Sequence, residues 1–217
     1  MSAPTYRPDI DGLRTIAVVP VVLFHANLTG FTGGFVGVDI FFVISGFLIT
    51  TIIHRELSEG RFSILRFYER RILPALFVVL VAGLIAGWFT LAPTDYDKMG
   101  QSIFSALLFV SNLWFWRNSG GYFDGATDYL PMLHTWSLAV EEQFYIFFPL
   151  LLMLLHRIGR RLLLPAIVLL VAGSLAVAIW ATPRMPSASF YLLPTRIWEL
   201  GVGSLLALGL LPSAAPK

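Results

Sequence analysis

Long apolar stretches separated by short polar segments recur along the whole chain. Several approach the roughly 20 residues that a helix needs to cross the hydrocarbon core of a bilayer. This pattern predicts an all-α polytopic transmembrane helix bundle. The stretches are Ile16–Phe24, Phe35–Ile53, Ile72–Ala92, Phe144–Leu155, Leu162–Ala181 and Val202–Leu211.

Arginines give the topology of this bundle. They gather in two clusters, which are Arg55, Arg61, Arg66, Arg70 and Arg71, followed by Arg157, Arg160 and Arg161. The positive-inside rule places both clusters, together with Arg7 and Arg14, on the cytoplasmic side. The N-terminus is therefore expected in the cytoplasm.

Three apolar segments lie between the two clusters, yet an even number must cross. The segment 99–116 is the most polar of the three, so we predict that it is re-entrant or lies at the outer face, where cavity-lining backbone is tolerated. The residues 62–71 are expected to form an amphipathic helix on the cytoplasmic surface. Six spanning helices remain, near 10–28, 33–54, 72–92, 134–155, 162–181 and 196–211.

Composition supports a membrane protein. Hydrophobic residues make up 57% of the 217 residues and charged residues 13%, about half the charged fraction of a soluble domain. The net charge of +2 is explained by topology and does not indicate nucleic-acid binding. No cysteine is present, which excludes disulfides and thiol chemistry. The polar start differs from a secretory leader, so the first helix is expected to be retained, and the chain is expected to be a fragment of a longer protein.

The first apolar stretch carries an ionisable residue at each end, in RTIAVVPVVLFH. Arg14 and His25 are eleven residues apart, so on an ideal helix they share one face at a separation of about 16 Å. Ionisable groups within a membrane are costly and mark function by default. His25 is therefore a candidate general base, while for each residue the alternative is a role in helix orientation or packing.

Other polar residues are predicted at similar depth. Asp39, Glu141 and Glu142 are expected within roughly 13 Å of the outer boundary, counting about 1.5 Å of rise per residue. His134, Ser137 and Glu141 share a helix face by their spacing. For Asp39, Ser45, His134 and Trp136, an interhelical hydrogen-bond network that holds the bundle together is favoured over direct chemistry. No metal site is predicted. The polar residues predicted at this depth or in this network are Asp39, Ser45, His134, Trp136, Ser137, Glu141 and Glu142.

The chain also resembles the membrane-bound acyltransferase family 3, the bacterial O-acetylases of lipopolysaccharide O-antigen, peptidoglycan and other glycans. The resemblance rests on five motifs in order, DGLRTIAVVPVVLFH, GGFVGVDIFFVISGFLIT, FYERRILPAL, HTWSLAVEEQFYIFFPLLL and PTRIWELGVGSLLA. It implies that residues 1–217 form a transmembrane acyltransferase domain that is incomplete at its C-terminus.

The resemblance also implies an activity. The family moves an acyl group, usually acetyl, from cytoplasmic acyl-CoA to a glycan hydroxyl on the outer side of the bacterial inner membrane. The implied catalytic residues are His25, Glu141 and Glu142, and acyl-CoA is expected to be a donor substrate bound by Arg14, Arg66, Arg70 and Arg71. The last motif adds Arg196 and Glu199 as supporting residues.

Two mechanisms remain open at this point. His25 either deprotonates the acceptor hydroxyl for direct attack on the thioester or carries the acyl group itself as a nucleophile. A competing function is a proton-coupled transporter, which predicts inverted repeats that the sequence does not display. A structural anchor is a third alternative, and it leaves the layer of His25, Asp39 and Glu142 unexplained.

Overall fold

The computed structural model describes residues 8–26, 33–69, 74–120 and 130–209, and in these ranges the regular structure is entirely helical. The α-helices are α1 (Pro8–His25), α2 (Gly37–Ser58), α3 (Ile64–Glu69), α4 (Pro74–Thr90), α5 (Pro93–Leu107), α6 (Ser111–Asn118), α7 (Thr135–Ile158), α8 (Leu163–Ala181), α9 (Pro186–Tyr191) and α10 (Ile197–Ala207). The 3-10 turns are η1 (Gly34–Val36), η3 (Arg160–Leu162) and η4 (Leu193–Thr195). The all-α prediction is confirmed.

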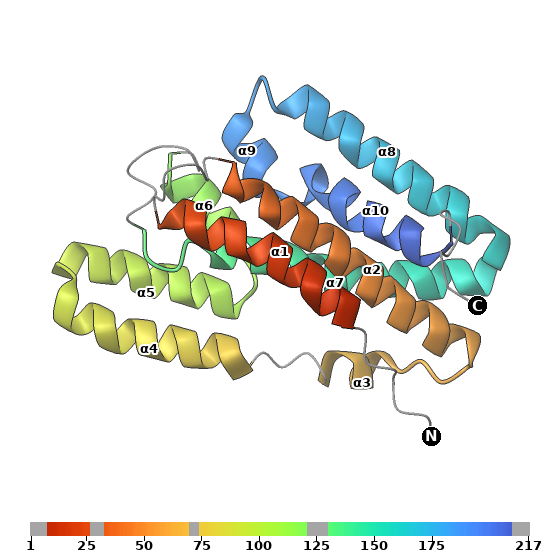
Figure 1. Ribbon diagram of the computed structural model, residues 1–217, viewed down its shortest axis with the longest axis horizontal. Coiled ribbons are helices and arrows are strands. Elements are labelled where there is room, and N and C mark those ends of the chain that lie inside the picture. Colours follow the sequence, from red (N-terminus) through yellow and green to blue (C-terminus); the bar gives the residue numbers. More distant parts are fainter. Residues whose placement is uncertain (1–7, 27–32, 70–73, 121–129, 210–217) are drawn as a thin grey trace.

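The long helices lie side by side along one axis of the molecule (Figure 1). The start of α1, the ends of α2 and α7 and the start of α8 lie at one end, and α3 lies there as well. We call this the basic end, because its helices carry Arg14, Arg55, Arg66, Arg157 and Arg160. His25 and the starts of α2 and α7 lie at the opposite end. The described arginines of both clusters therefore lie at one end of the bundle, as the predicted topology requires.

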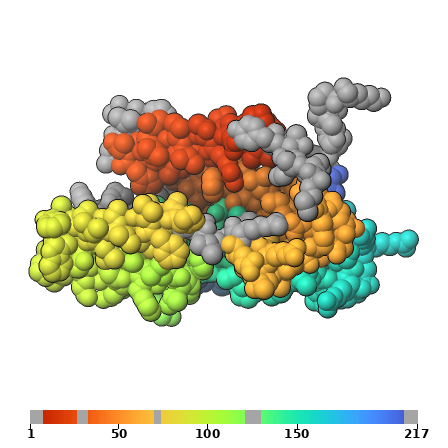
Figure 2. All heavy atoms as spheres, turned by 90° about the horizontal axis from the view of Figure 1, so that it is seen from below, coloured from red at the N-terminus to blue at the C-terminus, as the bar shows by residue number. Residues whose placement is uncertain are grey.

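Helix α1 lies on the outside of the molecule, with α2 beneath it and α4 and α5 in a layer further down (Figure 2). Glycines let these helices approach closely. A Cβ atom at Gly34 would lie 2.1 Å from the Pro20 carbonyl oxygen, and one at Gly37 would lie 2.1 Å from that of Ala17. Small residues of this kind permit the close backbone contacts on which membrane helices depend.

Helix α2 also packs closely against α10 through a glycine. A Cβ at Gly46 would lie 1.8 Å from the Leu200 carbonyl oxygen. The Thr50 hydroxyl donates to Ser204 Oγ over 2.8 Å across this contact. The pairing of α2 with α10 thus combines small residues with a buried hydrogen bond, although the two helices are distant in the sequence.

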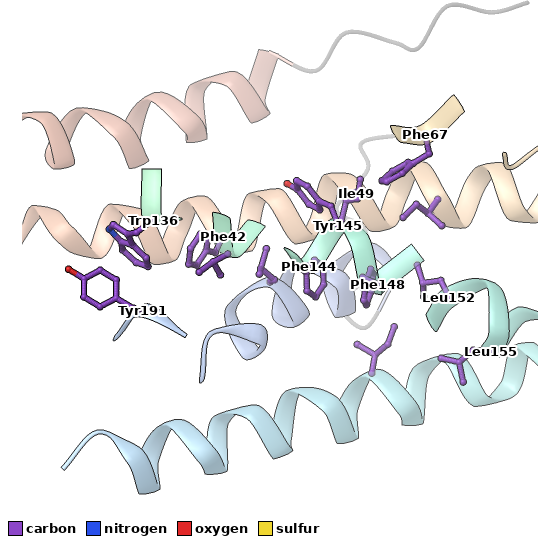
Figure 3. Packing of buried hydrophobic residues seen from close by; sticks show 14 of the residues in the cluster. Phe42, Ile49, Phe67, Trp136, Phe144, Tyr145, Phe148, Leu152, Leu155 and Tyr191 are labelled. Atoms are coloured by element: carbon purple, nitrogen blue, oxygen red, sulfur yellow. The ribbon is translucent and has the colours of Figure 1, made fainter. Parts of the chain in front are cut away.

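Aromatic residues fill the centre of the bundle between α2 and α7 (Figure 3). Phe42 is fully buried and makes an edge-to-face contact with Trp136, at a centroid distance of 6.2 Å. Phe144 and Phe148 stack at 4.4 Å. A hydrogen bond of 2.7 Å joins Ser45 Oγ to the Tyr145 hydroxyl within this core. Ser45 therefore takes part in an interhelical contact, which is the role favoured from the sequence.

Four helical stretches are long and apolar enough to cross a membrane, which confirms the membrane character in part. They are Gly34–Ser58, Ile64–Thr90, Thr135–Ile158 and Arg160–Ala181. Helices α1 and α10 belong to the predicted six but are not among these four. Helix α1 carries too many charged residues, namely Asp9, Asp11 and Arg14, and α10 is too short, with 11 residues. The number of six spans therefore stays a prediction.

The segment 99–116 is divided between α5 and α6, and neither helix is a candidate span. The break lies at Phe109, whose φ of 55° belongs to the left-handed region. Gln143 Nε2 donates to the Phe109 carbonyl oxygen and to Asn112 Oδ1, each over 2.8 Å. This turn is consistent with the predicted non-spanning segment. The side-chain amide of Gln143 on α7 provides the hydrogen bond that the Phe109 carbonyl oxygen needs at the break. The predicted surface helix over 62–71 includes the short α3 (Ile64–Glu69), and its position on the membrane surface stays a prediction, because the candidate span Ile64–Thr90 also begins there.

Candidate functional site

His25 is the last residue of α1, and its ring is exposed. Nδ1 lies 2.8 Å from the Val21 carbonyl oxygen. A carbonyl oxygen can only accept, so Nδ1 carries the proton and the lone pair of the neutral ring lies on Nε2. The backbone of α1 thus fixes the tautomer of the neutral ring and leaves the lone pair on Nε2, as the hypothesis of a general base or nucleophile at His25 requires.

His134 lies directly before the candidate span that begins at Thr135. Burial lowers the pKa of His134, and the Coulombic effect of the nearby His25 lowers it further. The two histidines therefore lie within electrostatic reach of each other. The Ser137 hydroxyl donates to the His134 carbonyl oxygen over 3.1 Å, which is a bond within the first turn of α7.

Arg196 links α2 to the start of α10 through two carboxylates. Its Nη1 lies 3.0 Å from Asp39 Oδ1 and 2.5 Å from Glu199 Oε1. Its guanidinium group also lies over the rings of Trp136 and Phe190, at 5.7 and 4.8 Å from their centroids. The side chains of Arg196 and Glu199 are 12% and 1% exposed. This Arg196 cluster unites four of the predicted supporting residues in one interhelical contact.

Glu141 and Glu142 are both buried on α7, at 6% and 7% exposure. They follow His134 by seven and eight residues, so they lie about 10 to 12 Å further along the helix axis. Their burial is established, whereas their depth below the outer boundary of the membrane stays a prediction. Their catalytic role remains a prediction.

Of the predicted donor residues, the structure describes Arg14 and Arg66. Arg14 is exposed and forms a loose ion pair with Asp11, at 3.9 Å. Arg66 is exposed on α3. Arg70 and Arg71 fall outside the described residues. Helix α3, which carries Arg66, and the first half of α1, which carries Arg14, lie towards the same end of the bundle, whereas α1 ends with His25 at the opposite end (Figure 1).

Sequence reasoning missed a pocket of about 350 Å³ between the start of α5 and α6. An indole, a carboxylate, an ammonium group, two amides and a hydroxyl surround it, from Thr94, Asp97, Lys98, Gln101, Trp114 and Asn118. The signal available in the sequence was the polarity of the segment 99–116, which was used only for topology. In the described ranges, no group of three residues is arranged to hold a metal ion.

Comparison with known proteins places the chain in a family. O-acetyltransferase OatA of Staphylococcus aureus strain NCTC 8325 is 36% identical over 223 residues, which cover 100% of this chain and 37% of that protein. SAS0844 of Staphylococcus aureus strain MSSA476, whose name provisionally describes an O-acetyltransferase, is 37% identical over 209 residues, covering 93% of this chain and 34% of that protein.

The chain thus spans about a third of the length of these curated relatives. No solved structure shows a significant match. The profile of the acyltransferase domain (Acyl_transf_3) matches residues 7–211, so the chain belongs to the acyltransferase 3 family.

Proposed function

We propose that the full-length protein is a membrane O-acyltransferase that moves an acyl group, usually acetyl, from cytoplasmic acyl-CoA to a glycan hydroxyl on the outer side of the bacterial inner membrane. The observation that carries this proposal is the hydrogen bond of His25 Nδ1 to the Val21 carbonyl oxygen, because it directs the basic lone pair to Nε2. Helix α1 also carries an arginine towards its other end, so one helix links the two substrates.

The donor binds at the basic end in this proposal. Coenzyme A carries phosphates, which guanidinium groups bind in a bidentate manner. Arg14 is exposed and shares only a loose ion pair, so its guanidinium is available to a ligand. Arg66, Arg70 and Arg71 would add to the positive charge. The acyl-pantetheine arm then extends along the bundle from Arg14 towards His25.

The acceptor binds at the opposite end. The pocket of Trp114 offers an indole face together with hydroxyl, amide and carboxylate groups. The indole can stack against a sugar ring, and the polar groups can form hydrogen bonds with the sugar hydroxyls. Its volume of about 350 Å³ falls in the range of small-molecule sites. The acceptor is proposed to be a cell-surface polysaccharide such as lipopolysaccharide O-antigen, or a lipid-linked glycan.

In the direct route, His25 Nε2 accepts the proton of the acceptor hydroxyl while the oxygen of that hydroxyl attacks the thioester carbon. The C–S bond breaks, and the proton passes from the imidazolium to the departing thiolate. In the alternative route, Nε2 itself attacks the thioester carbon, and the C–S bond breaks to release coenzyme A as the thiolate. The acyl-imidazolium then passes the acyl group to the hydroxyl oxygen, and the proton of that hydroxyl passes to the thiolate. In both routes the buried carboxylates of Glu141 and Glu142 would stabilise the positive imidazole.

The test uses membranes that contain the full-length protein and acetyl-CoA labelled in the acetyl group. The wild type is expected to transfer label to glycan, and His25→Ala is expected to abolish transfer without preventing membrane insertion. Val21→Ala is the control, because it keeps the carbonyl that orients the ring. A well-inserted His25→Ala protein with near-normal transfer would overturn the assignment.

A further inference from the structure

A group of cationic side chains at the basic end has no part in the function proposed above. His156 belongs to the last turn of α7 and Arg160 opens η3, and Arg160 Nη2 lies 3.3 Å from His156 Nε2. His54 of α2 lies within electrostatic reach of both. We call these three residues the His156 cluster.

The contact between His156 and Arg160 determines where the histidine proton lies. Arginine offers only donors, so His156 Nε2 must be the acceptor. The proton of the neutral ring therefore lies on Nδ1. Within the part of the chain that the structure describes, Nδ1 is buried and has no hydrogen-bond partner. Each unsatisfied buried donor in a native protein calls for an explanation, and for a donor that meets no acceptor among the described residues one explanation is an acceptor from a ligand.

The surroundings of this donor favour an anion. Arg160 contacts His156, and His54 lies within electrostatic reach of both. In the described ranges Arg160 forms no ion pair, and Glu59, near the end of α2, pairs with Arg61. The turn η3 also leads directly into α8, whose N-cap Leu162 provides no side-chain cap. The positive end of that helix adds to the field of the cluster.

We propose that the His156 cluster is a binding site for a phosphate group. The His156 Nδ1–H and the Arg160 guanidinium donate to phosphate oxygens, and His54 supplies further donor capacity from α2. Two molecules at a cytoplasmic membrane surface present this chemistry: coenzyme A with its adenosine phosphates, and an anionic phospholipid. The coenzyme source rests on the proposed function, whereas the phospholipid source does not.

Topology alone is the competing explanation, because loop arginines also satisfy the positive-inside rule. Arg157 separates the two explanations. It lies next to His156 and carries the same charge as Arg160, but among the described residues it forms no hydrogen bond with a histidine. Topology predicts equal effects for Arg157→Gln and Arg160→Gln, whereas a phosphate site predicts an effect of Arg160→Gln only.

The experiment uses the full-length protein in phosphatidylcholine nanodiscs. One arm titrates adenosine 3′,5′-bisphosphate, which carries phosphates of coenzyme A without the thioester. The second arm adds phosphatidylglycerol and measures the increase in melting temperature. We expect Arg160→Gln to weaken the apparent affinity for one of these two ligands about tenfold or more, as loss of a charge-assisted hydrogen bond predicts. Arg157→Gln should leave both apparent affinities within about threefold of the wild type.

His54→Gln is the second variant, in case Arg160→Gln does not fold. Loss of the bisphosphate response identifies the coenzyme as the ligand, and loss of the phosphatidylglycerol response identifies the phospholipid. Equal losses in Arg160→Gln and Arg157→Gln, or no loss in either arm, would overturn the site. Neither readout requires turnover, so a failure of His25 as the catalytic base leaves this result interpretable.

Discussion

Gly37→Ala tests whether the position of α1 controls the reaction. The backbone of Gly37 is ordinary right-handed helix, with φ of −57°, so alanine introduces no conformational strain there. Its Cβ would lie 2.1 Å from the Ala17 carbonyl oxygen, and ordinary contact begins at 3.4 Å. Going from 2.1 to 3.4 Å requires α1 to retreat by about 1.3 Å, because a backbone atom cannot rotate away.

That retreat of α1 carries His25 with it, since Ala17 and His25 both belong to α1. A misplacement of about 1 Å can cost about 100-fold in rate. We therefore expect kcat for acyl transfer to fall by about 100-fold in the full-length enzyme, while the protein still inserts. Steady-state kinetics with labelled acetyl-CoA measures the fall, and thermal unfolding reports the stability.

The matched control is Gly173→Ala in α8, where a Cβ would meet nothing within 4 Å. There alanine should leave kcat unchanged and raise helix stability by up to about 1 kcal/mol. Val21→Ala combined with Gly37→Ala should not restore activity, because it relieves the 2.8 Å contact to the Val21 side chain but not the carbonyl clash. A Gly37→Ala enzyme with kcat within about threefold of wild type would refute the reasoning.

Three further predictions concern the ends of the bundle. Arg14→Lys should raise KM for acyl-CoA with little effect on acceptor saturation, because a point charge cannot replace the planar guanidinium; a defect confined to the acceptor would contradict it. Trp114→Ala should raise the acceptor KM by about tenfold through lost stacking, which saturation curves for both substrates can check. Cysteines at positions Glu59 and Gly159 should label from the cytoplasm and one at Asp97 from outside; labelling of Asp97→Cys from the cytoplasm would refute the topology.

Local periodicity predicted much of the fold. The apolar stretches correspond to long helices, and the spacing of Arg14 and His25 places them towards opposite ends of one continuous α1. The polarity of 99–116 indicated a segment unlike the others, but not its turn at Phe109. That turn depends on the amide of Gln143, which approaches from α7, and no spacing rule relates two residues on different helices.

The candidate site was less accessible to sequence reasoning. His25 was identified because an ionisable residue in an apolar helix is conspicuous. The choice of Nε2 as its reactive atom required the carbonyl of Val21. The Arg196 cluster joins Asp39 to a residue far along the chain, and only the packing of α2 against α10 brings the two charges together.

The Arg196 cluster has a consequence for biosynthesis. Asp39 and Arg196 are separated by 157 residues, so α2 leaves the ribosome long before its cationic partner exists. At about 5 to 20 residues per second, the interval is about 8 to 30 s. During this time Asp39 lacks the guanidinium that it contacts in the fold, and the synthesis of Arg196 and α10 then supplies this partner. The contact between α2 and the start of α10 therefore forms late, and nascent chains stalled before Arg196 should remain open to membrane chaperones and proteases.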